Sequence, residues 1–547
     1  METTKTPSQP IAVSAIHDLL KDAVQRFPDV KAVDFLGKRT SYAALGRLVD
    51  SAAAGFQRLG VKKGTRVALC LPNTPYYIIC YYAILRVGGV VVNLSPLYVE
   101  KELRYFFADS GARIAVTLDI AELFDKFRPI VTEGILDCLV VGSMLDSLDI
   151  IKKCGFWLTQ RKKLAAIPKK LGYMRFADLL AGSTPASPVA CDPIHDLAVL
   201  QYTGGTTGVP KAAMLTHANL TANCTQVRRR LPDITPGEGM LTLVPLFHVF
   251  AMTAALNLSI MLGLEMILLP RYDKALLRKT LVRTKPLFFP GVPTIYANIN
   301  EATQKEKWEL SSLRYCVSGA APLPGEVRKK FEQISGCQLV EGYGLSEASP
   351  VVACNYFGLV RDGSIGLPVD ETVVEIRDKD DPAKRVAQGE KGEVCVRGPQ
   401  VMRGYWNRPD ETAKVLVDGF LHTGDVGYQD EDGYIFLVDR IKDLIISGGY
   451  NVYPRILEEV LYKHPAVLEA VVVGIPDAKR GQVPKAYVKL QDGVRVTEAE
   501  LLAFMAEHLS PVERPKKIEF REALPKTVVG KISRKDLIAE EATKQGS

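Results

Sequence analysis

The chain has 547 residues, of which 47% are hydrophobic and 24% are charged, and its net charge is +7. This composition is that of an ordinary globular protein, and the length favours about three to four structural units over one core. The ten cysteines are scattered with no C-x-x-C pair, which argues against a disulfide framework or a zinc site and for a reducing compartment.

The first residues predict no export signal. Met1 is followed by "ETTKTPSQP", which has neither a cationic region nor an apolar one. The most apolar stretch, residues 76–94, contains Arg86 and a glycine pair, so it predicts a buried helix followed by a strand rather than a membrane span. We therefore expect a cytoplasmic protein, with a peripheral position on the inner face of the membrane left open.

From the N-terminus the pattern alternates between helix and strand. Residues 16–27 place apolar side chains on one helical face. Strands are then predicted at 66–71, 90–94 and 112–118, with helices at 74–87 and 99–111 between them. Such alternation predicts βαβ units, that is, parallel sheets covered by helices.

Residues 151–175 carry most of the excess positive charge. The eight cations of this segment, with no acid among them, are Lys152, Lys153, Arg161, Lys162, Lys163, Lys169, Lys170 and Arg175. Apolar residues such as Trp157 and Leu158 are interleaved with them. The segment is compatible with an anionic membrane surface or with a solvated basic excursion. Nucleic acid is disfavoured, because nothing else in the chain resembles a recognition module.

Residues 202–211 read "YTGGTTGVPK" and concentrate glycine, threonine and one lysine. An apolar run typical of a buried strand precedes them, and residues 211–223 look helical. Strand, glycine-rich loop and helix is the usual geometry for holding phosphate, with Lys211 as a mobile charge. Val209 and Pro210 separate Gly208 from the lysine, so this is not a Walker A loop. A solvated surface turn is the alternative.

Residues 339–349, "LVEGYGLSEAS", predict a strand end followed by a tight turn. If a polyphosphate is bound, Mg²⁺ needs oxygen ligands, and Glu347 suits that role. Tyr343 offers a flat face for a base. Glu347 could also simply cap a helix.

Residues 419–440 contain a second acidic cluster. Asp425 follows Thr423 and Gly424 in what we expect to be a turn, and one carboxylate can accept hydrogen bonds from both ribose hydroxyls. The acids of residues 430–432 are expected to form only a hairpin turn.

The last hundred or so residues predict a small α+β unit. It has strands at 468–477 and 485–490 and a helix at 497–509, with Thr497 and Glu500 spaced as a capping box. The charged and then glycine-rich stretch 438–454 before it is a plausible hinge. Lys531 follows Gly530 near the C-terminus and, taken alone, is an ordinary surface lysine.

Together these segments resemble the AMP-forming acyl-CoA synthetase (adenylate-forming) superfamily. "YTGGTTGVPK" looks like its phosphate loop, "PLFHVF" (245–250) its aromatic gate, and "VSGAAPL" (317–323) with "GYGLSEAS" its adenine and magnesium motifs. "TGD", "DRIKDLIISGGYNVYP" and "PKTVVGKISRKDL" complete the set in family order, from about Ile16 to Leu537. Within this superfamily, these motifs most resemble those of bacterial long-chain fatty-acid–CoA ligases.

The resemblance implies an α/β fold: a large N-terminal adenylation domain (1–441) of parallel-sheet βαβ layers with a β-rich subdomain, and a small mobile α+β domain (442–547). It also implies that ATP activates a fatty acid to acyl-AMP and pyrophosphate, after which the acyl group passes to CoA. ATP, Mg²⁺ and CoA are thus the expected cofactors and co-substrate. A homodimer is left open.

The resemblance also implies a role for each matching residue. The phosphates would be held by Thr203, Gly204, Gly205, Thr206, Thr207, Gly208 and Lys211. Adenine would be lined by Gly319, Ala320 and Ala321 and stacked on Tyr343, with Gly342, Gly344 and Ser346 completing the nucleotide site. Asp425 and Arg440 would hold the ribose, Glu347 and Thr203 Mg²⁺, and His248 the acyl carboxylate. Lys531 would bridge carboxylate and α-phosphate, Lys442 would be the hinge, and Gly448 and Gly449 would line the CoA tunnel.

One position departs from the family pattern. Some relatives carry a tryptophan two residues after the position of Phe250, where this chain has Met252, so aromatic gating of the acyl tunnel is in doubt. A fatty-acyl-AMP ligase that loads a carrier protein, and a ligase for medium-chain or aryl acids, stay open as alternatives. A non-enzymatic nucleotide sensor is disfavoured because Lys531 and Glu347 are both present.

Overall fold

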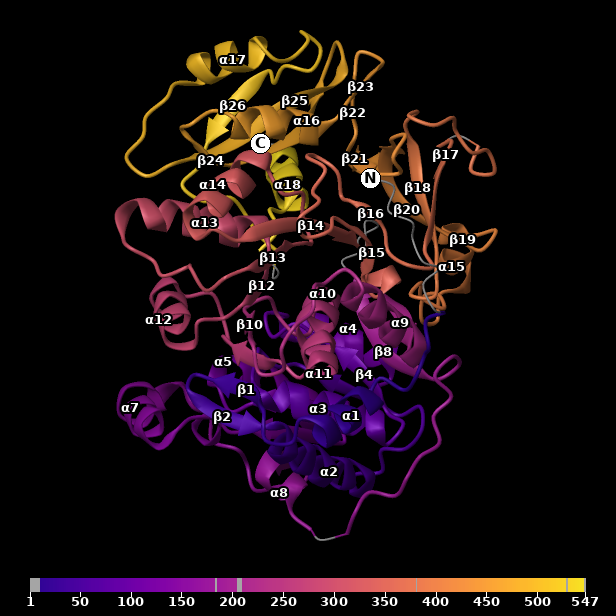
Figure 1. Cartoon of the computed structure of the whole chain (residues 1–547), viewed down its shortest axis with the longest axis vertical. Coiled ribbons are helices and arrows are strands. Elements are labelled where there is room, and N and C mark those ends of the chain that lie inside the picture. Colours follow the sequence, from indigo (N-terminus) through magenta and orange to yellow (C-terminus); the bar gives the residue numbers. More distant parts are fainter. Residues whose placement is uncertain (1–9, 183, 204–208, 380, 528–529, 546–547) are drawn as a thin grey trace.

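The computed structural model describes residues 10–182, 184–203, 209–379, 381–527 and 530–545. Figure 1 shows the N-terminal sheets stacked in the lower and middle parts of the molecule and the C-terminal residues at its upper end. The α/β class expected from the sequence is confirmed, with a separate small C-terminal unit.

The first sheet has seven strands in the order β7-β6-β5-β3-β4-β8-β9. Its strands are β3 (Arg66–Leu69), β4 (Val90–Asn93), β5 (Ile114–Leu118), β6 (Cys138–Gly142), β7 (Tyr173–Arg175), β8 (Leu197–Thr203) and β9 (Lys211–Thr216). All neighbours are parallel except β8 and β9. The predicted βαβ alternation over residues 66–118 is therefore confirmed.

The second sheet has nine strands in the order β16-β15-β14-β13-β12-β10-β11-β1-β2. They are β1 (Lys31–Phe35), β2 (Lys38–Ser41), β10 (Gly239–Thr242), β11 (Glu265–Leu268), β12 (Phe288–Gly291), β13 (Tyr315–Ser318), β14 (Gln338–Gly344), β15 (Val351–Cys354) and β16 (Leu367–Pro368). Its central strands are parallel, so their carboxyl ends meet at one edge, where β13 and β14 deliver predicted site residues.

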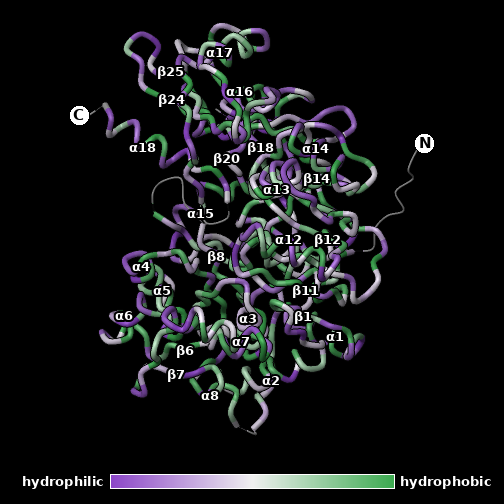
Figure 2. The backbone as a smooth tube through the Cα atoms, turned by 90° about the vertical axis from the view of Figure 1, so that its left-hand side faces the viewer, coloured by the Kyte–Doolittle hydropathy of each residue, from purple (hydrophilic) through white to green (hydrophobic). Residues whose placement is uncertain are grey.

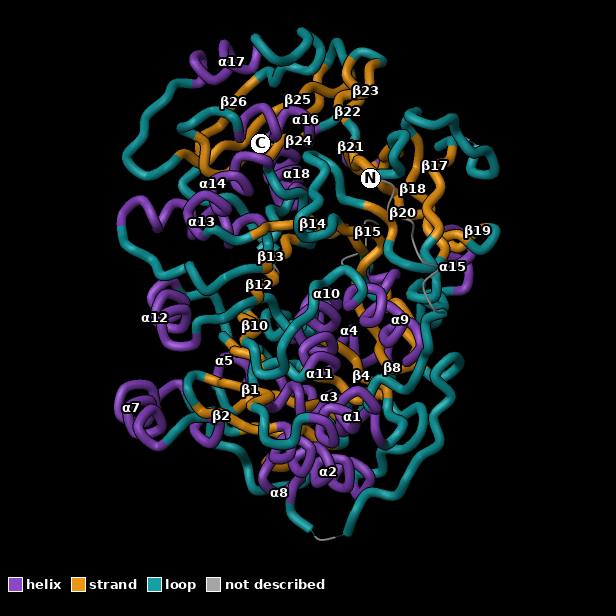
Figure 3. Tube along the Cα trace, in the orientation of Figure 1, coloured by secondary structure: helices purple, strands orange, loops and turns teal. Residues whose placement is uncertain are grey.

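Helices cover and separate these sheets (Figure 3). In the first half of the chain they are α1 (Asp18–Arg26), α2 (Tyr42–Arg58), α3 (Pro75–Arg86), α4 (Glu100–Ser110), α5 (Ala121–Phe124), α6 (Arg128–Thr132), α7 (Ile150–Gln160), α8 (Phe176–Leu180), α9 (His217–Arg228), α10 (Val249–Ala251), the π-helix η4 (Met252–Asn257) and α11 (Leu258–Leu262). They are followed by α12 (Lys274–Thr284), α13 (Pro293–Lys305) and α14 (Gly325–Ser335). Within the described ranges, no helix is both long and apolar enough to cross a bilayer.

Helix α3 is the expected buried helix, and it lies in the core shared by the two sheets. Tyr77 and Tyr82 have no exposed surface, yet both hydroxyls are paired. Tyr77 Oη donates to Asn93 Oδ1 at 2.8 Å, and Tyr82 Oη donates to Asn257 Oδ1 at 2.8 Å. Buried tyrosines need such partners, because an unpaired hydroxyl would lose its hydrogen bonds to water.

The prediction of a helix over residues 211–223 is wrong for its first half. Lys211–Thr216 form strand β9, which pairs antiparallel with β8, and helix α9 begins only at His217. The side chain of Thr216 accepts a hydrogen bond from Asn219 N, and Asn219 Oδ1 accepts one from Thr216 N, which fixes the helix start. The glycine-rich segment therefore connects two antiparallel strands rather than a strand and a helix.

A smaller antiparallel sheet follows. It consists of β17 (Val373–Arg377), β18 (Gly392–Arg397), β19 (Leu416–Val417), β20 (Phe420–Gln429) and β21 (Ile435–Arg440), with α15 (Pro409–Val415) beside it. The acidic residues 430–432 form the turn between β20 and β21, as predicted.

The C-terminal unit has its own sheet and core. Its elements are β22 (Ile445–Ser447), β23 (Tyr450–Val452), α16 (Pro454–Tyr462), β24 (Val467–Asp477), β25 (Gly481–Leu490), α17 (Glu498–Ala506), β26 (Lys517–Phe520) and α18 (Arg534–Gln545). The predicted capping box is present, since Thr497 and Glu500 exchange hydrogen bonds. Two core clusters within residues 445–537 explain why this unit forms a body of its own.

One buried carboxylate, Asp439, links the small unit to the rest of the chain. Asp439, at the end of β21, accepts from Arg455 N at 2.8 Å and lies 3.5 Å from Arg534 Nη1. Arg534 also contacts Asp443 at 3.1 Å and Glu458 at 2.7 Å. Asp439 is only 8% exposed, so these pairs are shielded from water.

Candidate active site

Three predicted nucleotide-binding residues meet at the junction of β14, β20 and β21. Asp425 and Arg440 are directly opposite one another on paired strands, and Arg440 Nε lies 3.1 Å from Asp425 Oδ1. Tyr343 Oη donates to Asp425 Oδ2 at 2.5 Å. Asp425 belongs to strand β20, so the expected turn at this position is wrong. Asp425 is only 7% exposed, so ribose hydroxyls that bind its carboxylate have to displace the Tyr343 hydroxyl or the Arg440 guanidinium.

Burial and the Asp425 carboxylate determine the protonation states of Tyr343 and Arg440. Burial, reinforced by Asp425, raises the pKa of Tyr343 well above its usual value, so its hydroxyl stays a donor. Burial is the largest single influence on Arg440 and alone would lower its pKa, but Asp425 together with Tyr343, Asp443 and Glu347 raises that pKa above its usual value. The site thus presents one anion between a neutral donor and a cation.

A buried pair that the sequence did not point to holds the strand carrying Asp425. Glu393 Oε1 accepts from Gly424 N at 2.8 Å, and Glu393 Oε2 lies 2.8 Å from His422 Nδ1. Cys395 Sγ is 3.4 Å from the same His422 nitrogen. Glu393 is on β18 and lies about thirty residues before its partners, so only strand pairing brings them together.

We expect Glu393→Gln to weaken ATP binding. The amide oxygen can still accept from Gly424 N, but the negative charge is gone, so the strand carrying Asp425 loses its hydrogen bonds to a charged group, each worth about 1.5–3 kcal/mol. The KM for ATP should rise about tenfold or more, with a smaller change in kcat. Steady-state kinetics at varied ATP measure this.

A double-mutant cycle separates positioning from mere destabilisation. If Glu393 acts by holding Asp425, Glu393→Gln and Asp425→Asn together raise the KM for ATP less than the sum of their separate effects. Additive effects, or a loss of kcat alone, contradict the role.

Glu347 lies in the 3₁₀ turn η5 (Ser346–Ala348), against which strands β8 and β9 pack. It does not cap a helix. Tyr405 Oη donates to its Oε1 at 2.7 Å, and among the described residues no basic group forms an ion pair with it and no hydrogen bond reaches Oε2. A half-buried carboxylate with a free oxygen is the donor chemistry that Mg²⁺ takes, with phosphate oxygens supplying further ligands. The residues present therefore fit the ion.

The structure describes only some of the predicted phosphate-loop residues. Gly204, Gly205, Thr206, Thr207 and Gly208 lie outside the described residues.

The residues on either side of that loop are paired. Thr203 and Lys211 are opposite one another on β8 and β9, and Thr203 Oγ1 donates to the Lys211 carbonyl at 3.4 Å. Lys211 Nζ pairs with Glu411 on α15 and lies 5.4 Å from the centre of the Tyr405 ring. Lys211 lowers the pKa of Glu411 to about 2, so a bound phosphate has to compete with this carboxylate.

The remaining adenine-motif residues lie along two strand ends. Gly342 and Gly344 flank Tyr343 in β14, and Ser346 opens η5. Ala320 and Ala321 are half-buried after β13, where Ala320 takes a positive φ of 66°.

Gly319 and His248 both lie next to Phe250, Gly319 against its ring and His248 at its backbone N–H. A Cβ at position 319 would lie 3.1 Å from Phe250 Cζ, so glycine permits the close approach. Burial lowers the pKa of His248 to about 4, which keeps the imidazole neutral. Its Nδ1 accepts from Phe250 N at 3.3 Å, so the proton sits on Nε2, which can donate. Met252, in η4, has no exposed surface and accepts from Asn93 Nδ2 at 3.5 Å.

Lys531 reaches the site from the small C-terminal unit. Burial and the nearby guanidinium groups of Arg440 and Arg534 lower its pKa to about 8. The preceding residue contacts the large part directly, since Thr294 Oγ1 donates to the Gly530 carbonyl at 3.0 Å. Lysine and nucleotide residues are thus brought together in this orientation.

Gly448 and Gly449 are not part of this assembly. They form the exposed tip of the β22–β23 hairpin, and a Cβ at position 449 would meet no atom within 4 Å. Lys442 is exposed in the 3₁₀ turn η6 (Ile441–Asp443) that links the two parts.

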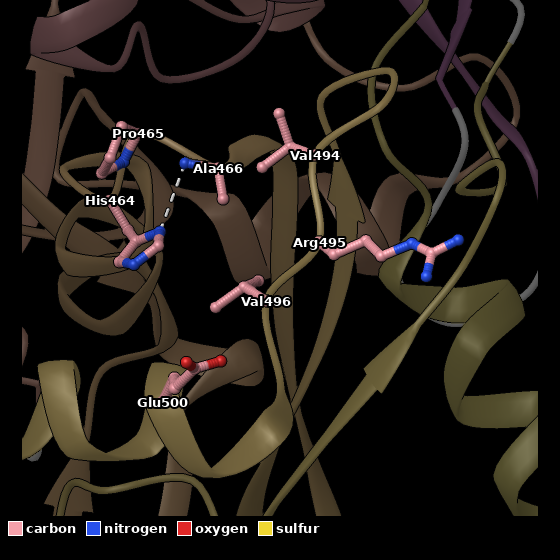
Figure 4. Close-up of a pocket in the computed structure, with 7 residues that line it drawn as sticks. All are labelled: His464, Pro465, Ala466, Val494, Arg495, Val496 and Glu500. Atoms are coloured by element: carbon pink, nitrogen blue, oxygen red, sulfur yellow. Dashed lines mark hydrogen bonds between the residues drawn. The ribbon is translucent and has the colours of Figure 1, made fainter.

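A depression elsewhere in the small unit contains none of the predicted residues. Figure 4 shows its lining residues, His464, Pro465, Ala466, Val494, Arg495, Val496 and Glu500. The only hydrogen bond drawn among them joins Ala466 N to His464 Nδ1, at 3.2 Å. Glu500 belongs to α17, and the other six residues lie in the loops that follow α16 and precede α17.

Fold and comparisons together define an adenylate-forming enzyme with a separate C-terminal unit. The chain belongs to the AMP-binding enzyme family, whose model matches residues 20–406, and the AMP-binding enzyme C-terminal domain matches residues 457–531. It is 45% identical to a long-chain-fatty-acid–CoA ligase of Bacillus subtilis, over 97% of this chain and 95% of that protein. A Salmonella typhimurium ligase of the same name is 38% identical over 96% of this chain and 95% of that protein. ATP-bound MatB from Rhodopseudomonas palustris has a similar structure, with a TM-score of 0.83, 27% identity, and coverage of 96% of this chain and 99% of that one.

Proposed function

We propose that this protein is a long-chain fatty-acid–CoA ligase, which uses ATP to convert the acid to acyl-AMP and pyrophosphate and then passes the acyl group to CoA. The observation that carries the proposal is the meeting of Lys531 with Asp425 and Arg440 at one site. The full-length likeness to ligases named for long-chain fatty acids supports the choice of substrate.

In the first step the acid's carboxylate attacks the α-phosphate, and negative charge grows on the phosphate oxygens and the leaving pyrophosphate. Lys531 would bridge the carboxylate and the α-phosphate, and Lys211 would hold the leaving phosphates. Fixed cations at these places stabilise the transition state. Asp425 and Arg440 hold the ribose, and Tyr343 stacks on adenine.

His248 orients the acid. Its neutral ring donates from Nε2 because Nδ1 already accepts from Phe250 N. That donor suits one oxygen of the acyl carboxylate and leaves the other free to attack. Glu347, with Thr203, would hold Mg²⁺, which when bound offsets charge on the phosphates.

The second step needs a different surface of the small domain. Gly448 and Gly449 are exposed in this orientation, and a Cβ at position 449 would meet no atom within 4 Å, while Lys531 lies near Arg440 and Asp425. We place the boundary at residues 441 and 442 and let the small domain turn about Lys442 between the two steps. The glycine pair would then line the passage of the thin pantetheine arm of CoA.

A ladder of acids from short to long tests the proposal. The specificity constant kcat/KM should rise with chain length, because each buried methylene contributes about 0.8 kcal/mol, or roughly fourfold. Acyl-CoA should form only when CoA is added. Preference for aryl or medium-chain acids refutes the long-chain assignment, and acyl-AMP that is released to a carrier protein but not to CoA favours the acyl-AMP ligase.

A further inference from the structure

Helix α7 (Ile150–Gln160) projects from the body of the protein. It protrudes at the left of Figure 1 and faces the viewer in Figure 2. None of its residues is buried, and only Phe156 packs against the core. The 3₁₀ turn η3 (Arg161–Lys163) continues it.

The outer face of α7 is apolar. Ile150 and Ile151 are 82% and 85% exposed, Trp157 is 48% exposed and Leu158 is 71% exposed. At 100° per residue these side chains cover about 120° of the helix, on the side opposite Phe156. Isolated exposed apolar residues are common, but four on one helical face call for a partner.

The cations around this face differ in their pairing. Lys152 and Lys153 are neutralised by Asp149 and Asp146, each at 2.8 Å, so the basic segment is less charged than the sequence of 151–175 suggested. The remaining six form no ion pair with any residue that the structure describes: Arg161, Lys162, Lys163, Lys169, Lys170 and Arg175. Three of them, Arg161 to Lys163, directly follow the apolar face.

We propose that α7 and η3 dock on an anionic lipid bilayer, with Ile150, Ile151, Trp157 and Leu158 inserted at the level of the headgroups and Arg161 to Lys163 on the lipid phosphates. An apolar helical face joined to unpaired cations is the composition that such an interface binds. The inference goes beyond the ligase activity and does not depend on it.

Other partners fit this surface less well. Nucleic acid offers phosphates for Arg161 to Lys163, but it has no apolar phase for Ile150, Ile151 and Leu158. A second copy of the chain would bring the same unpaired cations face to face, which is repulsive. An anionic bilayer offers both an apolar phase for the exposed apolar side chains and phosphates for the cations.

Co-sedimentation of the full-length protein with vesicles tests the proposal, without ATP, acid or CoA. The vesicles contain phosphatidylcholine with a rising fraction of phosphatidylglycerol. Binding should rise with that fraction and fall with added KCl. The triple variant Arg161→Glu, Lys162→Glu, Lys163→Glu should bind at least about a hundredfold more weakly, since each cation near the surface is worth about fivefold.

Three matched variants make the result specific. Lys101→Glu, Lys279→Glu and Lys307→Glu together change the net charge equally at exposed lysines without ion pairs among the described residues, and should leave binding nearly intact. Trp157→Ser with Leu158→Ser should abolish it. Trp157→Phe should still bind, but should lose the blue shift of tryptophan emission that vesicles produce.

Several results would overturn the proposal. Binding that ignores both lipid charge and salt, or that survives the triple variant, shows that α7 is not the docking surface. Vesicle-independent dimerisation that Trp157→Ser with Leu158→Ser abolishes shows a self-interface instead, and salt-sensitive binding to duplex DNA without vesicle binding shows a nucleic-acid surface. A protein that fails here can still form acyl-CoA, so the ligase assignment is tested separately.

Discussion

Lys531→Ala is expected to lose acyl-AMP formation by about a hundred- to a thousandfold while still converting supplied acyl-AMP and CoA to the thioester. Its ammonium group is the cation that the small domain contributes beside Asp425 and Arg440, and removing one such donor costs about that much in rate. Rapid-quench assays of each half-reaction measure the two rates separately. Equal losses in both steps would contradict the proposed domain rotation.

Gly449→Leu is the matched counterpart. Position 449 is in open space in the present orientation, so the variant should form acyl-AMP normally and accumulate it, with little thioester. Gly449 has a φ of 84°, so Gly493→Leu, at another exposed glycine of positive φ (78°), controls for backbone strain. A Gly449→Leu defect in adenylation would place this hairpin in the first step.

The pH profile tests Lys531 without removing it. With a pKa of about 8 in the free enzyme, Lys531 is charged below that pH and loses its proton above it. The kcat/KM for adenylation, which reports the free enzyme, should therefore fall on the alkaline side of about 8. Lys531→Arg should move that fall to higher pH, because a guanidinium does not deprotonate in this range.

Glu347→Ala is expected to abolish both adenylation and its pyrophosphate-dependent reversal, by about a thousandfold, with the fold intact. Loss of one protein ligand to Mg²⁺ costs several kcal/mol of transition-state stabilisation. Pyrophosphate exchange into ATP is the direct measurement, and thioester formation from supplied acyl-AMP should persist.

Two variants control for the loss of a carboxylate. Glu326→Ala removes one from the exposed first turn of α14 and should change nothing. Tyr405→Phe removes only the hydrogen bond to Glu347 and should have an intermediate effect. Near-normal exchange in Glu347→Ala would refute the metal assignment.

Local patterns in the sequence predict most of the fold, because a helix or strand that buries one face has apolar residues that recur with the helical or strand period. They fail at residues 211–216, where "KAAMLT" is equally compatible with a helix. Strand β9 forms there because it completes the edge of β8, a tertiary preference that overrides local propensity. The cap formed by Thr216 and Asn219 was the available signal for the true helix start.

Some residues of the candidate site could likewise be predicted from local sequence, and others could not. Tyr343, Glu347, Asp425 and Arg440 belong to compact motifs and could be predicted, whereas Tyr405 could not. It reaches Glu347 because the backbone of 403–406 pairs with β9, far away in sequence. Glu411 and Glu393 likewise meet their partners only after the sheets form.

Asp439 joins the two domains through a very small number of bonds. It accepts from Arg455 N and lies near Arg534, and charge-assisted hydrogen bonds of this kind contribute about 1.5–3 kcal/mol. Thr294 with Gly530 and Lys305 with Asp492 add further contacts between the two parts. If the small domain turns as proposed, a ligand shifts the equilibrium only by its difference in affinity for the two orientations, so Asp439→Asn should alter how often the enzyme switches while the chemistry of each step stays the same.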